Sequence, residues 1–147
     1  RLAAGHLTLE GGEADATIGE QAHYLGHQDA VKPSLTVGEN LEFWGRYLGA
    51  ASSIEPALEA VDLAPLVNLP AAYLSAGQGR RLSIARLMLN MRPIWLLDEP
   101  TAALDAPSQA RLAELMRRHL AAGGMIVAAA HGPIGLERAR ELKLGPA

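Results

Sequence analysis

The spacing of apolar residues changes several times along the chain, and each spacing predicts a type of element. Apolar and polar residues alternate over 7–10, ahead of a Gly-Gly pair, and a second candidate strand follows over 22–27. Unbroken apolar runs over 94–97 and 125–130 are typical of buried parallel strands. Apolar residues at helical spacing predict helices over 36–48, 54–61, 75–91, 107–121 and 136–139.

Capping residues and helix breakers mark the ends of these helices. Thr36 precedes the first helix with Glu39 three residues later, which is the pattern of a capping box. Pro93 ends the third helix, and Gly123 ends the fourth. Helix and strand alternate over the second half of the chain, which predicts an α/β fold with a parallel sheet. The carboxyl ends of such strands usually carry the chemistry.

Composition narrows the class of protein. The chain has 147 residues, of which 49% are apolar and 20% are charged, which suggests one domain with a sizeable core. A net charge of −3 gives no general attraction to nucleic acid or anionic lipid. The absence of cysteine excludes disulfides, thiolate catalysis and cysteine-based metal sites, and fits a reducing compartment. The longest apolar run, 125–130, is far shorter than the roughly 20 residues that cross a bilayer.

Two adjacent carboxylates, Asp98 and Glu99, follow the apolar run over 94–97. Mg²⁺ prefers oxygen ligands, keeps several waters and usually takes few protein carboxylates. Asp98 could hold it directly or through water, and Glu99 could orient or deprotonate a water that attacks a phosphate. The alternative is a pair of solvated surface acids. The apolar run before the pair and the segment Pro100–Asp105 after it favour the magnesium site.

A second motif, Leu74–Gln78, stands where a helix is expected to begin. The unpaired N–H groups and the positive dipole end of a helix start make an anion site. Gly77 would let a ligand approach the backbone closely. The hydroxyl of Ser75 could donate to a phosphate oxygen, or it could simply cap the helix.

Three further polar residues follow predicted strands or precede a predicted helix. His131 comes after the strand over 125–130 and could contact a terminal phosphate, or it could bond to the backbone. Gln28 ends the early strand and could reach a metal or its water, or it could be an ordinary loop residue. Asp105 could bond within its own loop or across a dimer interface.

Taken in this order, the motifs resemble those of the ATPase subunits of ABC transporters. Leu74–Gln78 resembles the signature motif of that family, and Leu96–Asp105 resembles its Walker B motif, catalytic glutamate and D-loop. His131 stands at the position of the switch histidine, and Gln28 falls where the family has its Q-loop. Ala76 departs from the glycine that is usual in the signature, which puts close packing against phosphate in question.

The resemblance covers about residues 7–144 and implies a P-loop NTPase-like α/β fold that is incomplete at the amino end. A helical signature subdomain is expected over about residues 30–92, and the Walker B and switch part of the parallel-sheet core over 93–147. Two subunits are expected to close head to tail around two ATP molecules and Mg²⁺. The implied partners are transmembrane permease subunits and a second ATPase subunit, with no nucleic acid. The implied location is peripheral, on the cytoplasmic face of the inner membrane.

The same resemblance implies a role for each candidate residue. The catalytic residues would be Glu99, His131 and Gln28. The metal would be held by Asp98 and Gln28. The nucleotide of the facing subunit would be contacted by Ser75, Ala76, Gly77, Gln78 and Asp105.

A narrower resemblance is to the haem-exporter ATPases of cytochrome c biogenesis. It rests on the segments Tyr24–Gln28 and Leu35–Leu41 and on the pair Phe43-Trp44. It also rests on the chain ending soon after Leu144, with no further domain expected. This resemblance implies export of haem, although the choice of substrate belongs to the membrane subunits.

A P-loop motif, Gly-x-x-x-x-Gly-Lys-Ser/Thr, does not occur in these residues. The chain has two lysines, Lys32 and Lys143, and neither follows glycines at that spacing. Family members carry the loop ahead of the position of Arg1, so we interpret the start as an internal cut. A fragment of an active ATPase and a degenerate subunit both stay open. In both cases we predict weak ATP binding, no hydrolysis by the chain alone, and apolar surface left uncovered.

Two other functions share some of these features. ABC-type ATPases of DNA maintenance usually contain a long coiled coil, but the chain has no sustained heptads. A non-catalytic interaction module is the other alternative. The segment 36–67, with aromatic residues such as Trp44 and Tyr47, is the candidate dock for a permease, or else those aromatics form subdomain core.

Overall fold

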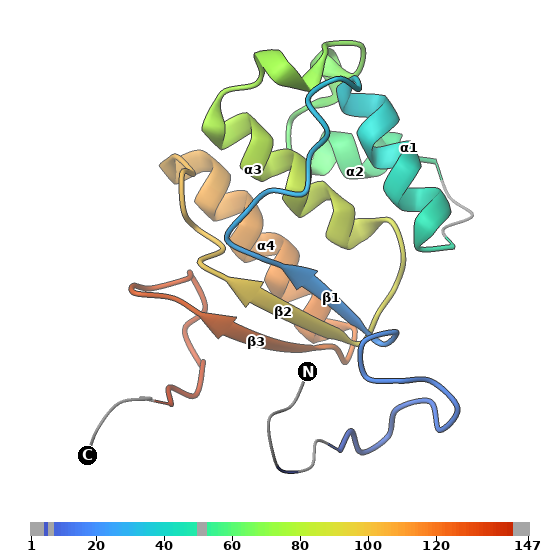
Figure 1. Cartoon of the computed structure of the whole chain (residues 1–147). Coiled ribbons are helices and arrows are strands. Elements are labelled where there is room, and N and C mark those ends of the chain that lie inside the picture. Colours follow the sequence, from blue (N-terminus) through green and yellow to red (C-terminus); the bar gives the residue numbers. More distant parts are fainter. Residues whose placement is uncertain (1–4, 6–7, 50–52, 143–147) are drawn as a thin grey trace.

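The computed structural model describes residue 5 and residues 8–49 and 53–142. Its strands end together, because Leu97 lies beside Leu25 on one side and Ala128 on the other (Figure 1). All three strands are parallel, in the order β1-β2-β3, with the bounds β1 (Ala22–Leu25), β2 (Ile94–Asp98) and β3 (Met125–Ala129). The predicted α/β class and parallel sheet are therefore confirmed.

Four of the five predicted helices are present in the described residues. The α-helices are α1 (Val37–Tyr47), α2 (Glu55–Ala60), α3 (Ala76–Ala85) and α4 (Ala106–Ala121). The 3₁₀ turns are η1 (Ala64–Leu66), η2 (Ala71–Tyr73) and η3 (Arg86–Met88). The helices lie on one side of the sheet, with α4 beside the strands and α1 and α2 furthest away (Figure 1).

The predicted capping box at Thr36 is present at the start of α1. The Thr36 hydroxyl accepts the N–H of Glu39 at 3.1 Å, and the Glu39 carboxylate accepts the N–H of Thr36 at 2.7 Å. Each bond satisfies an N–H group that the first turn of a helix leaves free. A cap of this kind contributes about 1 kcal/mol to helix stability.

The core lies between the sheet and the helices. Alternate strand residues, among them Leu25, Trp95 and Leu97, are buried under the helical layer. Leu112 and Met116 of α4 belong to the same core. The period of two along the strands and the helical period along α4 therefore bring their apolar faces together.

No described helix covers the opposite face of the sheet, although Ala22 and Ile94 at the start of the strands are buried on it. Tyr24, Met125 and Val127 lie on this face and are 61%, 51% and 57% exposed. The prediction that 125–130 is a fully buried strand is therefore wrong, because the described helices cover only the other face. Uncovered apolar surface, which the sequence predicted, is present here.

Three predicted elements differ from the observed structure. Residues 8–10 form coil and a turn, with no neighbouring strand to pair with among the described residues, and residue 7 lies outside them. The helix predicted over 136–139 does not form, and Gly135 just before it has φ +80°, which a helix does not accommodate. The helix predicted over 75–91 is α-helical to Ala85 and continues as a 3₁₀ turn to Met88.

The described helices are too short or too polar for any of them to cross a bilayer. Regular structure in the described residues between 37 and 88 is helical, as expected for a signature subdomain. The division into a helical part over 30–92 and a core part over 93–147 stays a prediction.

Candidate functional site

The carboxyl ends of β2 and β3 bring two predicted catalytic residues together. The N–H of Glu99 donates to the carbonyl oxygen of Ala129 at 2.8 Å, which continues the ladder one residue past β2. His131 follows two residues later, and its Nε2 lies 3.8 Å from Glu99 Oε1. The Glu99 side chain is 28% exposed and that of His131 is 99% exposed. The two groups therefore meet at the sheet edge, where a solvent-borne ligand can reach both.

Asp98 ends β2, and its side chain points toward the uncovered face because Leu97 points toward the helices. Its backbone carbonyl accepts a hydrogen bond from Arg80, whereas its carboxylate has no hydrogen-bond partner among the described residues. Within the same residues, no group of three His, Asp or Glu side chains could hold a metal alone. Asp98 thus fits Mg²⁺ that takes one protein carboxylate and completes its shell with water and phosphate oxygens.

The start of α3 is built by a second capping box. The Ser75 hydroxyl accepts the N–H of Gln78 at 3.2 Å, and Gln78 Oε1 accepts the N–H of Ser75 at 2.8 Å. Ser75 therefore caps the helix, while its own O–H remains able to donate to a ligand oxygen. Ser75 and Ala76 are exposed, so the positive end of the helix faces solvent.

Gly77 fixes how closely α3 approaches the loop after β2. A Cβ at this position would lie 2.8 Å from the carbonyl oxygen of Ala103, which is closer than real Cβ atoms come. Glycine is therefore required for packing against this loop, and not only for ligand access. In the described residues no hydrogen bond or ion pair joins Ser75–Gln78 to Glu99 or His131 of the same chain. This separation agrees with a signature that serves the facing subunit.

Asp105 occupies the cap position of α4. Its carboxylate accepts the N–H of Ser108 at 3.0 Å. Hydrogen bonds from Ser108 lower the pKa of the Asp105 carboxyl, because they stabilise its charged form. The structure thus shows the bond within its own loop, and contact across a dimer interface stays a prediction.

Gln28 is exposed in the segment that follows β1. Gly26 and Asp29, on either side of it, both bind the guanidinium of Arg80. The same guanidinium also binds the carbonyl oxygens of Asp98 and Glu99. Gln28 is therefore held near the end of β2, although no contact joins it to these carboxylates in the described residues.

Arg80 is the residue that the sequence analysis missed. It lies off the apolar stripe of α3 and belongs to none of the motifs singled out in the sequence, yet it is 3% exposed. The one signal in the sequence is its place three residues after Gly77, which puts both on the same face of the helix.

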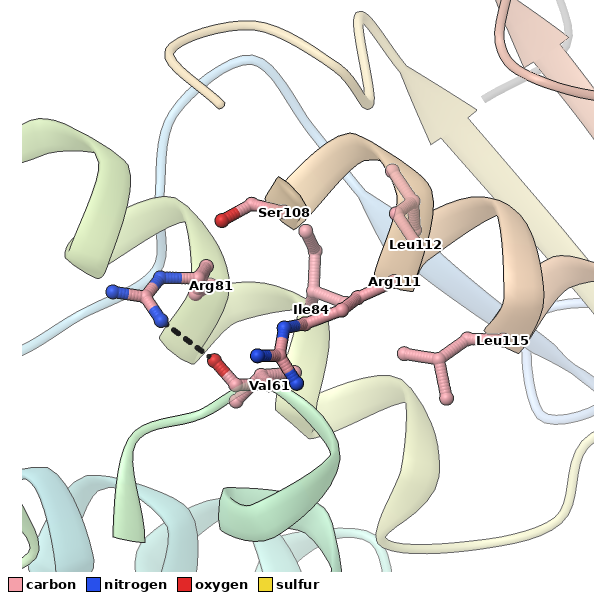
Figure 2. A pocket seen from close by; sticks show the side chains of 7 residues that line it. All are labelled: Val61, Arg81, Ile84, Ser108, Arg111, Leu112 and Leu115. Atoms are coloured by element: carbon pink, nitrogen blue, oxygen red, sulfur yellow. Dashed lines mark hydrogen bonds between the residues drawn. The ribbon is translucent and has the colours of Figure 1, made fainter. Parts of the chain in front are cut away.

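A small pocket lies away from the Glu99–His131 pair, between α3, α4 and the turn after α2 (Figure 2). Its volume of about 10 Å³ is at the lower limit for one water molecule. Arg81 at its rim donates to the carbonyl oxygen of Val61 at 2.9 Å. The pocket is therefore a packing feature and not a site for a nucleotide.

Comparison with known proteins agrees with the motifs. Residues 1–102 match the family model described as ABC transporter. The cytochrome c biogenesis ATP-binding export protein CcmA of Rhodopseudomonas palustris (strain BisB5) is 60% identical, over 99% of this chain and 72% of its own length. The protein of the same name from Nitrobacter winogradskyi is 59% identical, over 99% of this chain and 73% of its own length.

Two solved structures share the fold. An ABC transporter ATP-binding protein from Pyrococcus furiosus has a TM-score of 0.67 at 24% identity, over 78% of this chain and 58% of its own. An ATP-binding subunit of an ABC transporter has a TM-score of 0.68 at 24% identity, over 76% of this chain and 49% of its own.

The family model covers more than half of the chain, and the export proteins are similar over nearly all of it. The motifs that resemble the signature, Walker B and switch histidine follow one another along the chain at the start of α3, the end of β2 and after β3. The chain therefore belongs to the ABC transporter family, as an ATP-binding protein of the cytochrome c biogenesis, haem-exporter type.

Proposed function

We propose that this chain supplies the signature, Walker B and switch residues of an ATP-hydrolysing subunit that drives export of haem for cytochrome c maturation. The observation that carries the proposal is the 3.8 Å approach of Glu99 and His131 at the ends of two parallel strands. The names of the similar export proteins support the transport role. In this proposal permease subunits hold the protein at the cytoplasmic face of the inner membrane.

Each residue at the sheet edge has a distinct task in the proposed reaction. Glu99 orients or deprotonates the water that attacks the γ-phosphate, and the partly buried position of its carboxylate just after β2 supports this role. His131 contacts the γ-phosphate through its exposed imidazole. The first turn of α3, with Ser75 and Gly77, stabilises phosphate charge on the nucleotide of the facing subunit.

Asp98 and Gln28 would hold Mg²⁺ in this reaction. The carboxylate of Asp98 would take one position of its shell, and the Gln28 amide oxygen would take another. Mg²⁺ would neutralise charge on the phosphates.

In this proposal the β- and γ-phosphates are bound by a P-loop, and the P-loop motif does not occur among these 147 residues. Activity is therefore measured in an assembled ATPase, in which the P-loop segment that family members carry is fused ahead of residue 1. Unless stated otherwise, the variants below are made in this assembled ATPase.

The chain by itself is expected to show no micromolar MgATP binding and no phosphate release, because it lacks the P-loop lysine and its backbone cradle. The assembled ATPase is expected to gain both. Isothermal titration and a phosphate-release assay check the two proteins side by side. Micromolar binding by the chain alone contradicts the first expectation. A folded assembled ATPase without hydrolysis contradicts the proposed function.

We also propose that α1 faces the permease with an aromatic surface made of Phe43, Trp44 and Tyr47. The rings of Phe43 and Tyr47 each meet Trp44 edge to face at 5.6 Å, and Tyr47 is 74% exposed. Trp44 donates from Nε1 to the carbonyl oxygen of Ala30 at 3.1 Å, which ties the surface to the segment after Gln28. Trp44 thus packs partly as core, whereas Tyr47 is free for a partner.

The variant Tyr47→Ala is expected to lower recovery of the permease subunits in co-purification several-fold, while ATP hydrolysis by the free subunit is unchanged. Aromatic side chains at the centre of an interface often contribute more than 1 kcal/mol to binding. Tyr73→Ala is the matched control, because Tyr73 is equally exposed at 75% but lies outside α1. Equal recovery with both variants contradicts this dock.

A further inference from the structure

A single buried guanidinium joins the ends of two strands. Arg80 in α3 is 3% exposed, and its Nη1 donates to the carbonyl oxygen of Gly26 at 2.7 Å and to Asp29 Oδ1 at 3.1 Å. Its Nη2 donates to the carbonyl oxygens of Asp98 at 2.8 Å and Glu99 at 2.7 Å. The terminal nitrogens of arginine carry four N–H groups, which matches these four bonds.

The acceptors lie where the β1–β2 ladder stops. Leu25 pairs with Leu97, so Gly26 and Asp98 come next on the two strands. Beyond the last pair the strands diverge: the segment after β1 runs along α3 toward α1, and the chain after β2 turns toward α4 (Figure 1). Arg80 accordingly donates to the carbonyls of Gly26, Asp98 and Glu99 where the β1–β2 ladder ends, and the Glu99 oxygen also accepts the N–H of Ala102.

One of these carbonyls belongs to a strained residue. Glu99 has φ +45°, a left-handed backbone conformation that residues other than glycine rarely adopt. Such a conformation persists only where surrounding contacts impose it. The bond from Arg80 to Glu99 O and the bond from Glu99 N to Ala129 O act on the two sides of this residue. Together they set the direction in which the Glu99 carboxylate leaves the backbone.

The other half of the guanidinium acts on the segment that contains Gln28. Gly26 and Asp29 are held on either side of Gln28 by the same nitrogen. The ion pair with Asp29 is sheltered, because the Arg80 side chain is 3% exposed and that of Asp29 is 28% exposed. The span around Gln28 therefore has both ends fixed to the group that fixes Glu99.

We propose that Arg80 is a positioning residue that holds the backbone of Glu99 and the span 26–29 in one frame, so that the attacking water and the metal-binding amide keep their relative place. The inference rests on the proposed function for its consequence in catalysis. Arg80 itself contacts no nucleotide in this account. The planar guanidinium is required, because the three N–H groups of lysine belong to a single nitrogen atom. One nitrogen cannot donate to the ends of both strands in this pattern.

The kinetic test compares Arg80→Lys and Arg80→Ala with the parent assembled ATPase. Both are expected to lower kcat about 10- to 100-fold, because a misplaced catalytic group costs of this order, while KM for ATP changes less than about threefold. Millimolar guanidinium is expected to restore part of the kcat of Arg80→Ala and none of that of Arg80→Lys. Arg81→Ala is the matched control, because Arg81 also binds backbone carbonyls, those of Val61 and Asp62, but away from the strand ends.

A second test uses the 147-residue chain itself and needs no activity. Amide hydrogen exchange is followed in peptides that span 98–104, where the N–H of Ala102 donates to the same Glu99 oxygen at 3.1 Å. Arg80→Lys is expected to exchange at least about 10-fold faster there than the parent chain and than Arg81→Ala. If the parent assembled ATPase were inactive, the proposed function would fail and this exchange would decide the inference alone. Unchanged exchange, or a kcat that falls equally in Arg80→Lys and Arg81→Ala, overturns it.

Discussion

Replacing Glu99 by glutamine is expected to lower ATP turnover about 100-fold or more in the assembled ATPase. The amide keeps the shape of the side chain but cannot take a proton from water, and loss of a placed general base has effects of this size. Binding of MgATP is expected to persist, so the variant should accumulate as an ATP-bound dimer. Phosphate release and size-exclusion chromatography with MgATP measure the two expectations together.

Glu137→Gln is the matched control for this variant, since Glu137 is an exposed acid in a coil region. It receives the same chemical change without touching the sheet edge. Turnover by Glu137→Gln should equal that of the parent. Normal turnover in Glu99→Gln would remove Glu99 from its assigned role.

Adding a side chain at position 77 is expected to lower ATP turnover about as much as Glu99→Gln does, because it displaces the start of α3. A Cβ there would lie 2.8 Å from the carbonyl oxygen of Ala103, a backbone atom of a residue with φ +60°. Gly77→Ala should therefore push the start of α3 away from the loop 99–105. A displacement of about 1 Å at a catalytic constellation costs about 100-fold in rate. The turnover of Gly77→Ala, measured with circular dichroism as a check on folding, tests this.

Gly79→Ala is the control on the same helix. Its new Cβ would meet Asp29 Oδ2 at 3.6 Å, an ordinary contact, and alanine favours a helix over glycine by about 1 kcal/mol. Turnover should remain near that of the parent. Equal turnover in Gly77→Ala and Gly79→Ala would show that the close approach of α3 to the loop does not matter for catalysis.

Local signals in the sequence were sufficient for most of the fold. Thr36 caps its helix as predicted, and Ser75 takes the capping role that was one of its two alternatives, because a cap depends only on residues three positions apart. The apolar run over 94–97 became the central strand, and the acids after it reached the sheet edge. The meeting of Glu99 and His131 followed from the rule that parallel strands end together.

What the sequence did not predict depends on distant parts of the chain. The burial of β3 depends on whether other elements cover one face of the sheet or both. An apolar run such as 125–130 is compatible with either arrangement. The burial of Arg80 could not be inferred from neighbouring residues, because its acceptors come from segments 18 to 54 residues away. The left-handed conformation of Glu99 is likewise imposed from outside and has no local signature.

The structure of the Glu99→Gln assembled ATPase with MgATP tests the central claim most directly. The account predicts two subunits arranged head to tail. Each γ-phosphate is predicted to lie between position 99 and His131 of one subunit on one side and the first turn of α3 of the other subunit on the other side. Mg²⁺ is predicted beside Asp98. A nucleotide bound away from the ends of β2 and β3, or two subunits joined with both α3 starts turned away from the phosphates, would contradict it.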